Sequence, residues 1–390
     1  MKKIFFVINN FRKTPFKVAI ILLANFLCFF SCESQTKRIQ TIESQLNDSY
    51  VNYAKGFSIR KLGHVSELTI YNPWVGGSVL QKTYFISDTF PLPDSLQTSN
   101  VIRTPVKSLI TLSATQWGPL MTMNEAVRIK GVSEAGFITN KQMRHLFESG
   151  LVEEVAADGR YEIEKILRIQ PELILYSPDP TGVPTALENL GLPLLAWTDY
   201  FETNPLGRTE WIKILGLLVE KEEIAVQMFD SIAADYLRLK NLVSTTKERP
   251  TVFADKAFAG QWYVPGGKSY MARLFEDAGA TYVFADNNSE ASFPLDIETI
   301  YARAGKADYW RIAQAASAKY SYEQLKSENE LYASFKAFQE KKVVFCNILE
   351  TSYFERSPLE PNHMLADFIA IFHPELLPDH QPVFHQLLEP

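Results

Sequence analysis

The sequence is poor in cysteine, with three residues in 390: Cys28, Cys32 and Cys346. Two of them lie within the basic and apolar first 32 residues, so only Cys346, inside the apolar run 343–346, is left for the folded part of the chain. This excludes an internal disulfide there, and stability has to come from a buried core. Hydrophobic residues make up 46% of the chain, which is enough for the core of two domains.

The N-terminus has no apolar run long enough to span a bilayer. The run from Val18 to Phe30 is interrupted only by Asn25 and is too short to cross. Five basic residues and no acidic one precede it, which is typical of a secretory signal peptide. Ser31-Cys32 resembles the lipobox of bacterial lipoproteins, and this implies cleavage before Cys32 and acylation of that residue. The alternatives are an ordinary signal peptide and an uncleaved anchor.

Positive charge is scarce once this predicted signal, residues 1–31, is removed. The segment carries five of the 39 basic residues and none of the 45 acidic ones, so 34 basic residues face 45 acidic ones and the net charge becomes −11. Such a chain repels phosphate groups, and nucleic acid is not expected as a partner. Residues 32–47 are polar without apolar periodicity and are predicted to be a tether.

Catalytic motifs are absent from the sequence: it contains no nucleophile elbow, HExxH or CxxC. Gly266-Gly267-Lys268-Ser269 resembles the end of a phosphate-binding loop, but Trp262 stands where that loop needs its first glycine. We therefore expect no bound nucleotide, no cofactor and no catalytic residues, although a cleft enzyme stays open as an alternative class.

Histidines are few and late, and four of the six lie at positions 363, 373, 380 and 385. None of these four has the tight spacing of a zinc site, so we expect a surface tail and no direct metal site.

Strand-like apolar runs alternate with helical patterns in two stretches of the chain, which predicts an α/β fold with parallel-type sheets. The predicted strands of the first stretch are 106–112, 127–132, 173–176 and 193–197, and those of the second are 250–254, 282–284, 308–310 and 342–347. Ahead of both, three β-type runs within 53–87 are separated by turns and predict an antiparallel appendage.

A long helical segment, residues 206–243, separates the two stretches. Apolar residues recur at 3–4 spacing along it, and Glu220–Glu223 predicts a break between a first helix and a longer second one. Thr209 and Glu210 are expected to cap the first helix. The predicted organisation is an N-terminal lobe with its β-rich appendage (48–205), connecting helices (206–243) and a C-terminal lobe (244–390). An ordinary core helix of a single large domain is the alternative.

A short internal repeat supports two similar lobes. Ile163-Glu164-Lys165-Ile166 recurs as Ile297-Glu298-Thr299-Ile300, and each copy precedes an acidic residue and a strand. By helical phase the isoleucines face inward and the glutamates outward.

The sequence resembles the helix-hinged substrate-binding proteins that serve ABC importers of ferric siderophores, haem and cobalamin. The resemblance spans about residues 103–388 and is carried by four stretches: 109–115, 162–175, 294–310 and 365–375. It implies two α/β lobes joined by one long helix, with the ligand between the lobes. It departs from the family at Gln116, where an acid is common, and in the segment 53–100 before the first lobe.

The candidate ligand-binding residues are mostly aromatic, because aromatic walls grip large flat ligands and strand ends carry the sites of α/β proteins. Arg160 and Arg356 are predicted to occupy corresponding loops of the two halves and to pair with anionic ligand groups. Core packing is the alternative for every aromatic, and a solvated pair with Glu355 is the alternative for Arg356. The candidates are Trp117, Arg160, Trp197, Tyr200, Trp262, Tyr263, Trp310 and Arg356, with Phe201 and Phe354 in the same kinds of position.

The resemblance also implies that Glu164 and Glu298 dock on arginines of an ABC permease dimer, whereas ordinary solvated glutamates are the alternative. We expect a monomeric binding protein anchored through Cys32 on the periplasmic side of a membrane. Its expected ligand is a ferric siderophore or a related iron chelate, and cobalamin and haem are the alternatives.

Overall fold

The chain from residue 51 onward is organised around four sheets and the helices between them. The computed structural model describes residues 50–75, 80–90, 92, 100–180, 182–316 and 319–389. The predicted signal peptide, Cys32 and the predicted tether lie outside the described residues. No helix within these ranges is both long and apolar enough to cross a membrane.

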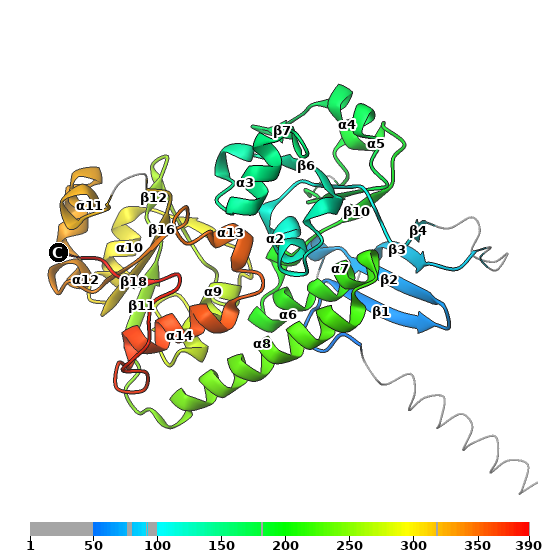
Figure 1. The fold of residues 1–390 in the computed structure, drawn as a ribbon. Coiled ribbons are helices and arrows are strands. Elements are labelled where there is room, and N and C mark those ends of the chain that lie inside the picture. The colour runs from blue at the N-terminus through cyan, green and yellow to red at the C-terminus, as the bar shows by residue number, and fades with distance from the viewer. Residues whose placement is uncertain are drawn as a thin grey trace, which may run out of the picture. The chain divides into compact units, whose positions relative to one another are not determined.

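The N-terminal sheet is the predicted appendage, drawn in blue in Figure 1. Three antiparallel strands, β1 (Phe57–Leu62), β2 (Val65–Tyr71) and β3 (Leu80–Ser87), are joined by β4 (Val101–Arg103), which runs parallel to β3. One face of β2 is fully buried at Leu68 and Ile70, as expected when alternate residues of a strand point to the same side.

The first lobe is built on a sheet of order β10-β9-β5-β6-β7-β8, in which only the edge strand β8 is antiparallel to its neighbour. Its strands are β5 (Leu109–Thr111), β6 (Ile129–Ser133), β7 (Glu153–Ala157), β8 (Arg160–Tyr161), β9 (Leu173–Tyr176) and β10 (Leu194–Ala196). Its helices are α2 (Ala114–Thr122), α3 (Lys141–Glu148), α4 (Ile163–Ile169) and α5 (Thr185–Glu188).

Three helices link the lobes: α6 (Pro205–Glu210), α7 (Ile212–Val219) and α8 (Glu222–Leu242). The break predicted at Glu220–Glu223 is present, because Glu220 adopts a left-handed backbone with φ of 58°. The predicted cap is wrong: Trp211 occupies the N-cap of α7 without a side-chain hydrogen bond.

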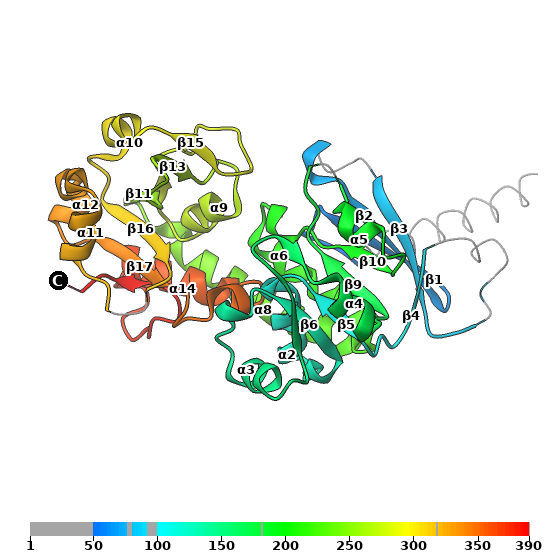
Figure 2. The same cartoon turned by 90° about the horizontal axis from the view of Figure 1, so that it is seen from above.

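The second lobe has a five-stranded sheet of order β14-β11-β16-β17-β18, parallel except for β18. Successive residues of β16 point to opposite faces: Tyr309 contacts Phe372 of α14, whereas Trp310 contacts Phe335 beside α12. The sheet therefore lies between α14 and α12, as Figure 2 shows. Its strands are β11 (Thr251–Ala254), β14 (Thr281–Tyr282), β16 (Tyr309–Gln314), β17 (Val343–Asn347) and β18 (Gln386–Leu387).

A smaller sheet in the same lobe has the order β12-β13-β15, from strands Ala257–Phe258, Gln261–Val264 and Phe293–Leu295. The helices of the lobe are α9 (Tyr270–Asp277), α10 (Ile297–Ala304), α11 (Tyr322–Glu328), α12 (Lys336–Gln339), α13 (Tyr353–Arg356) and α14 (Pro361–Phe372). Two α/β lobes with parallel sheets confirm the predicted fold class.

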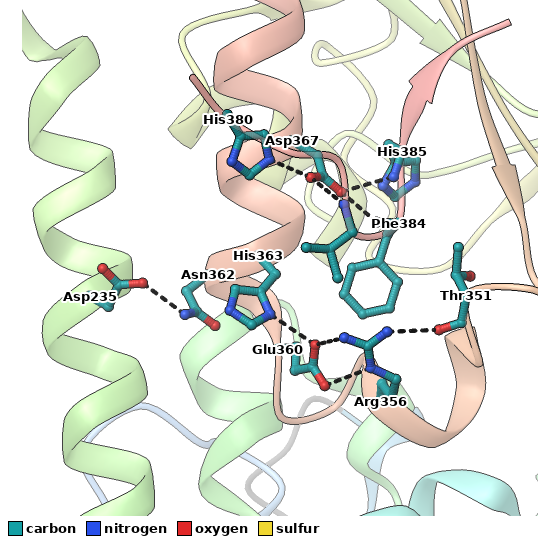
Figure 3. A network of polar contacts seen from close by, with 11 residues as sticks. Asp235, Thr351, Arg356, Glu360, Asn362, His363, Asp367, His380, Phe384 and His385 are labelled. Atoms are coloured by element: carbon teal, nitrogen blue, oxygen red, sulfur yellow. Dashed lines mark hydrogen bonds and ion pairs between the residues drawn. The ribbon is translucent and has the colours of Figure 1, made fainter. Parts of the chain in front are cut away.

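The long helix α8 packs along α14 (Figure 1). Asn362 of α14 donates a hydrogen bond from Nδ2 to Oδ2 of Asp235 on α8, at 2.8 Å (Figure 3). Tyr236 of α8 donates from its hydroxyl to Asp277 of α9, also at 2.8 Å. The connecting helix is thus fixed to the second lobe by one buried and one partly buried hydrogen bond as well as by packing against α14.

Candidate functional site

The two lobes touch where α13 of the second lobe meets α2 and the loop before α3. The carboxylate of Glu355 accepts hydrogen bonds from the amides of Thr139 at 2.6 Å and Asn140 at 3.1 Å. The hydroxyls of Ser352 and Thr139 are 2.8 Å apart. Gly118 makes this approach possible, since a Cβ there would overlap the carbonyl oxygen of Glu355. The sequence therefore encodes a close contact between lobes.

A second contact is polar and lies at the carboxyl end of β10. Asp199 accepts a hydrogen bond from Nε of Arg208 on α6 at 2.9 Å and one from the hydroxyl of Thr115 at 3.3 Å. The guanidinium carbon of Arg208 lies 5.5 Å from the ring centroid of Tyr270, a residue of the second lobe. Burial by itself lowers the pKa of Arg208, but the Asp199 carboxylate raises it overall, so the guanidinium stays charged.

The second lobe contributes another buried arginine at the end of its sheet. Arg311 donates from Nη1 to Asp255 at 3.0 Å and from Nε to Nε2 of His385 at 3.3 Å. Burial raises the pKa of Asp255, against the opposing effect of Arg311, and burial with Arg311 holds the pKa of His385 well below its usual range. His385 is therefore neutral, and its Nε2 is the acceptor.

A groove runs between the lobes beside these contacts. Its larger cavity, of about 340 Å³, is lined by Tyr53, Lys55, Thr203 and Asn204 on one side and by Gly267, Lys268, Ser269, Arg273 and Glu276 on the other. The adjacent cavity, of about 140 Å³, includes Lys55, Tyr71, Phe201 and, from the second lobe, Glu290. We call these two cavities the interlobe groove. The smaller cavity includes Thr198, just after the carboxyl end of β10, and parallel α/β sheets place binding sites at such strand ends.

A sequence model of the periplasmic binding protein family matches residues 121–347, more than half of the chain. The chain belongs to this family. Two lipoproteins of Methanocaldococcus jannaschii, both uncharacterized, are similar in sequence. One is 27% identical over 70% of this chain and 67% of its own length, and the other is 21% identical over 93% and 95%.

Solved structures of the family have the same fold. A periplasmic haem-binding protein of Pseudomonas aeruginosa is 15% identical, covers 73% of this chain and 99% of its own, and has a TM-score of 0.57. The vitamin B12-binding protein of Vibrio cholerae is 16% identical over 69% and 97%, with a TM-score of 0.52.

The predicted tryptophans do not line the interlobe groove. Trp117, Trp197, Trp262 and Trp310 are at most 2% exposed. The indole nitrogens of Trp262 and Trp310 donate to the carbonyls of Ala254 at 2.9 Å and Asp255 at 2.7 Å. These four side chains form the cores of the lobes, which corrects the expectation that they wall the ligand. A large aromatic ring buries more apolar area inside a lobe than at its rim.

The predicted tyrosines remain accessible at 45% each. Tyr200 donates its hydroxyl to the carbonyl of Pro178 at 3.0 Å, and burial, aided by Asp199, raises its pKa to about 12. Tyr263 lies on β13 and pairs with Gln261 at 3.1 Å. Neither lines the two groove cavities, although Phe201, next to Tyr200, lines the smaller one.

The two predicted arginines do not occupy corresponding loops. Arg160 is exposed on β8, after the Asp158-Gly159 turn. Arg356 lies on α13 and forms a two-pronged ion pair with Glu360, at 2.8 and 2.6 Å, with its guanidinium over Phe384 (Figure 3). Glu355, the alternative partner for Arg356, instead accepts the amides of Thr139 and Asn140 in the first lobe.

The predicted surface tail of histidines is also wrong in part, because His373 and His385 are at most 4% exposed. His380 bonds to the buried carboxylate of Asp367 at 2.6 Å, and that carboxylate also accepts the amides of residues 383–385 (Figure 3). The chain after α14 is thereby folded back onto the lobe. Within the described ranges no three histidine, cysteine or acidic side chains gather as a metal site would need.

The two glutamates of the internal repeat occupy equivalent places. Glu164 is in the first turn of α4 and Glu298 in the first turn of α10, and both are exposed. The isoleucines Ile166 and Ile300 beside them are fully buried.

Sequence reasoning missed two groove residues, Lys55 and Lys268, and also Arg208, which contacts Tyr270 of the second lobe. Arg208 lies in α6, the helix that begins after Asn204, and Lys268 lies in the Gly-rich turn 266–269 that resembles the end of a phosphate-binding loop. Lys55 carried no local signal, since its place depends on a contact with residues about 150 positions away.

Proposed function

We propose that this protein is the solute-binding component of an ABC importer and that it captures an iron chelate in the interlobe groove. Cobalamin and haem are the alternative ligands. The observation that carries the proposal is a groove lined by both lobes in a chain of the periplasmic binding protein family. The family consists of solute-binding proteins, so the protein holds its ligand without chemical change.

Iron chelates are favoured by the charges at the groove. Lys55, Lys268 and Arg273 line the larger cavity against one carboxylate, Glu276, so an anionic ligand gains attraction there. Structures with this fold include a possible iron-binding protein of Staphylococcus epidermidis and an Fe³⁺-hydroxamate transport protein of Saccharomonospora viridis. These two proteins agree with the proposal, and the haem and vitamin B12 proteins keep the alternatives open.

Delivery to the permease rests on Glu164 and Glu298. Each opens a helix of its own lobe, is solvent-exposed and has no buried partner to satisfy. Equivalent charges on two similar lobes suit a partner with two-fold symmetry. The Glu164→Arg, Glu298→Arg double variant is expected to abolish uptake by the cognate importer and to leave ligand affinity and melting temperature unchanged.

A matched control is the reversal of Glu188 and Glu323, two other exposed glutamates near helix ends. Uptake should survive this control. Uptake that also survives the reversal of Glu164 and Glu298 would refute their docking role, and lost ligand binding would place them in the ligand site instead.

Acylation of Cys32 would hold the protein at the outer face of a membrane. The two archaeal relatives are both named lipoproteins. Lipid labelling is expected to be lost in Cys32→Ala, and normal labelling of that variant would contradict the anchor.

The ligand is tested with the purified chain lacking residues 1–31. A panel of ferric tris-catecholate, ferric tris-hydroxamate, haem and cyanocobalamin is titrated while tryptophan fluorescence and melting temperature are followed. At least one member should quench fluorescence saturably and raise the melting temperature without being converted. Conversion of the ligand, or no response to any member, would contradict the proposal.

A further inference from the structure

The segment just before β1, residues 52–56, is held against the first lobe by two buried carboxylates. Glu210 accepts the amides of Asn52, Tyr53 and Ala54 at 2.7–2.9 Å. Glu202 accepts the amides of Lys55 and Gly56 at 2.9–3.1 Å. Five consecutive N–H groups thus converge on two side chains, an arrangement that fixes the backbone at each position.

Close packing strengthens this attachment. A Cβ on Gly56 would lie 2.8 Å from the Trp211 ring, and one on Gly207 would lie 2.9 Å from the carbonyl oxygen of Tyr53. Glu202 also accepts the indole N–H of Trp211 at 3.0 Å. The backbone of the segment is therefore held in place. This fixes where the side chains of Tyr53 and Lys55 leave the backbone beside the groove.

The opposite side of the groove is equally constrained. A Cβ on Gly267 would come within 2.7 Å of the Ala285 carbonyl oxygen, so only glycine fits this turn. The next residue, Lys268, is exposed, and Ser269 caps α9 by accepting the amide of Ala272 at 3.3 Å. Two constrained segments, one before β1 and one before α9, therefore present one lysine each to a single cavity.

Both ammonium groups are available. Among the described residues, neither Lys55 nor Lys268 forms an ion pair, whereas Arg273 is engaged by Glu276 at 3.2 Å and Asp277 at 3.1 Å on its own helix. Two unpaired positive charges across one cavity repel each other until an anion lies between them.

We propose that the segment 52–56 forms a third wall of the ligand site and that Lys55 and Lys268 together hold an anionic oxygen group of the ligand, such as a catecholate or carboxylate. This deepens the proposed function and rests on it. It also gives the N-terminal sheet a role, since Lys55 is positioned jointly by β1 and by the carboxylates of Glu202 and Glu210. It also makes ligand choice depend on charge: anionic chelates are preferred over neutral ones of similar size.

The test compares the chain lacking residues 1–31 with Lys55→Gln, Lys268→Gln and the double variant. Lys326→Gln, which removes the same charge from the exposed face of α11, is the control. The probes are an anionic ferric tris-catecholate, a neutral ferric tris-hydroxamate and citrate without iron. We expect each single variant to bind the catecholate roughly three- to tenfold more weakly and the hydroxamate unchanged. The loss should shrink as salt is raised.

Citrate separates this proposal from the proposed function. If citrate raises the melting temperature of the wild type but not of the double variant, the anion site stands even where no iron chelate binds. If chelates bind and the lysine variants bind them as tightly as Lys326→Gln does, the anion site is refuted while the proposed function survives. A Lys55→Gln variant that loses thermal stability with unchanged affinity for every probe would mean that the Lys55 side chain serves only the stability of the fold, which would also overturn the proposal.

Discussion

Replacing Glu210 by glutamine exchanges one carboxylate oxygen for an NH₂ group. This small change should strongly reduce the stability of the protein. The side chain is completely buried and bonds to three amides. It also pairs at 2.8 Å with the ammonium of Lys213, whose side chain is 4% exposed. Glutamine has the same shape but one acceptor oxygen. Oε1 faces Asn52 and Lys213, and Oε2 faces Tyr53 and Ala54, so either amide orientation sets an NH₂ group against two donors.

The expected loss follows from the buried pair. Removing one partner of a buried ion pair costs about 3–5 kcal/mol, because the other charge stays desolvated. A protein of this kind is stable by roughly 5–15 kcal/mol, so the variant loses a large part of its stability. Chemical denaturation followed by circular dichroism measures the free energy of unfolding directly.

Local and global effects can be distinguished in the same variant. Hydrogen exchange at the amides of residues 52–54 should become faster, because these donors lose their acceptor. Glu223→Gln removes an exposed carboxylate at the start of α8 and should change stability by less than about 0.5 kcal/mol.

A Glu210→Gln, Lys213→Met double variant should recover part of the loss, since an apolar side chain leaves no buried charge. A loss below about 1 kcal/mol in Glu210→Gln, with unchanged exchange at residues 52–54, would refute this account of how the N-terminal segment is attached.

Three further predictions concern the lobes and their pH dependence. Gly118→Ala should lower the free energy of unfolding by about 1–3 kcal/mol and separate α2 from α13, because the new methyl group overlaps Glu355. Denaturation measures the loss of stability, and small-angle scattering measures the separation. The control Gly136→Ala should be neutral, because its methyl group meets no atom within 4 Å. Burial opposes ionisation of Asp308, but hydrogen bonds from Lys336 and Thr251 outweigh it and lower the pKa of Asp308 to about 2. The stability that this carboxylate contributes is therefore lost as pH falls from about 4 toward 2. Asp308→Asn should flatten that part of the curve of stability against pH by at most about 1 kcal/mol after solvent screening, and an unchanged slope would contradict the lowered pKa. Scattering with and without ligand should show only slight compaction, since bending α8 breaks its i→i−4 hydrogen bonds; a large closure would count against a helical strut.

Much of the fold was accessible from the sequence because it depends on local patterns. The alternation of apolar strands and amphipathic helices predicted two α/β lobes, and the acidic run at 220–223 marked the break before α8. The site was less accessible. The four tryptophans were expected at the ligand, yet hydrophobicity by itself does not distinguish a core from a binding wall, and all four are core residues.

The sequence by itself determined the class of fold: two α/β lobes joined by a long helical segment, with a repeated glutamate in each lobe. Periodicity, composition and motif order carry that information along the chain. Only the tertiary structure decided what the charged residues do. Glu210, expected as a helix cap, accepts the amides of residues 52–54, and Glu355, the alternative partner for Arg356, bonds to the first lobe. Partners more than 150 positions apart leave no local pattern, because their proximity exists only after the chain has folded.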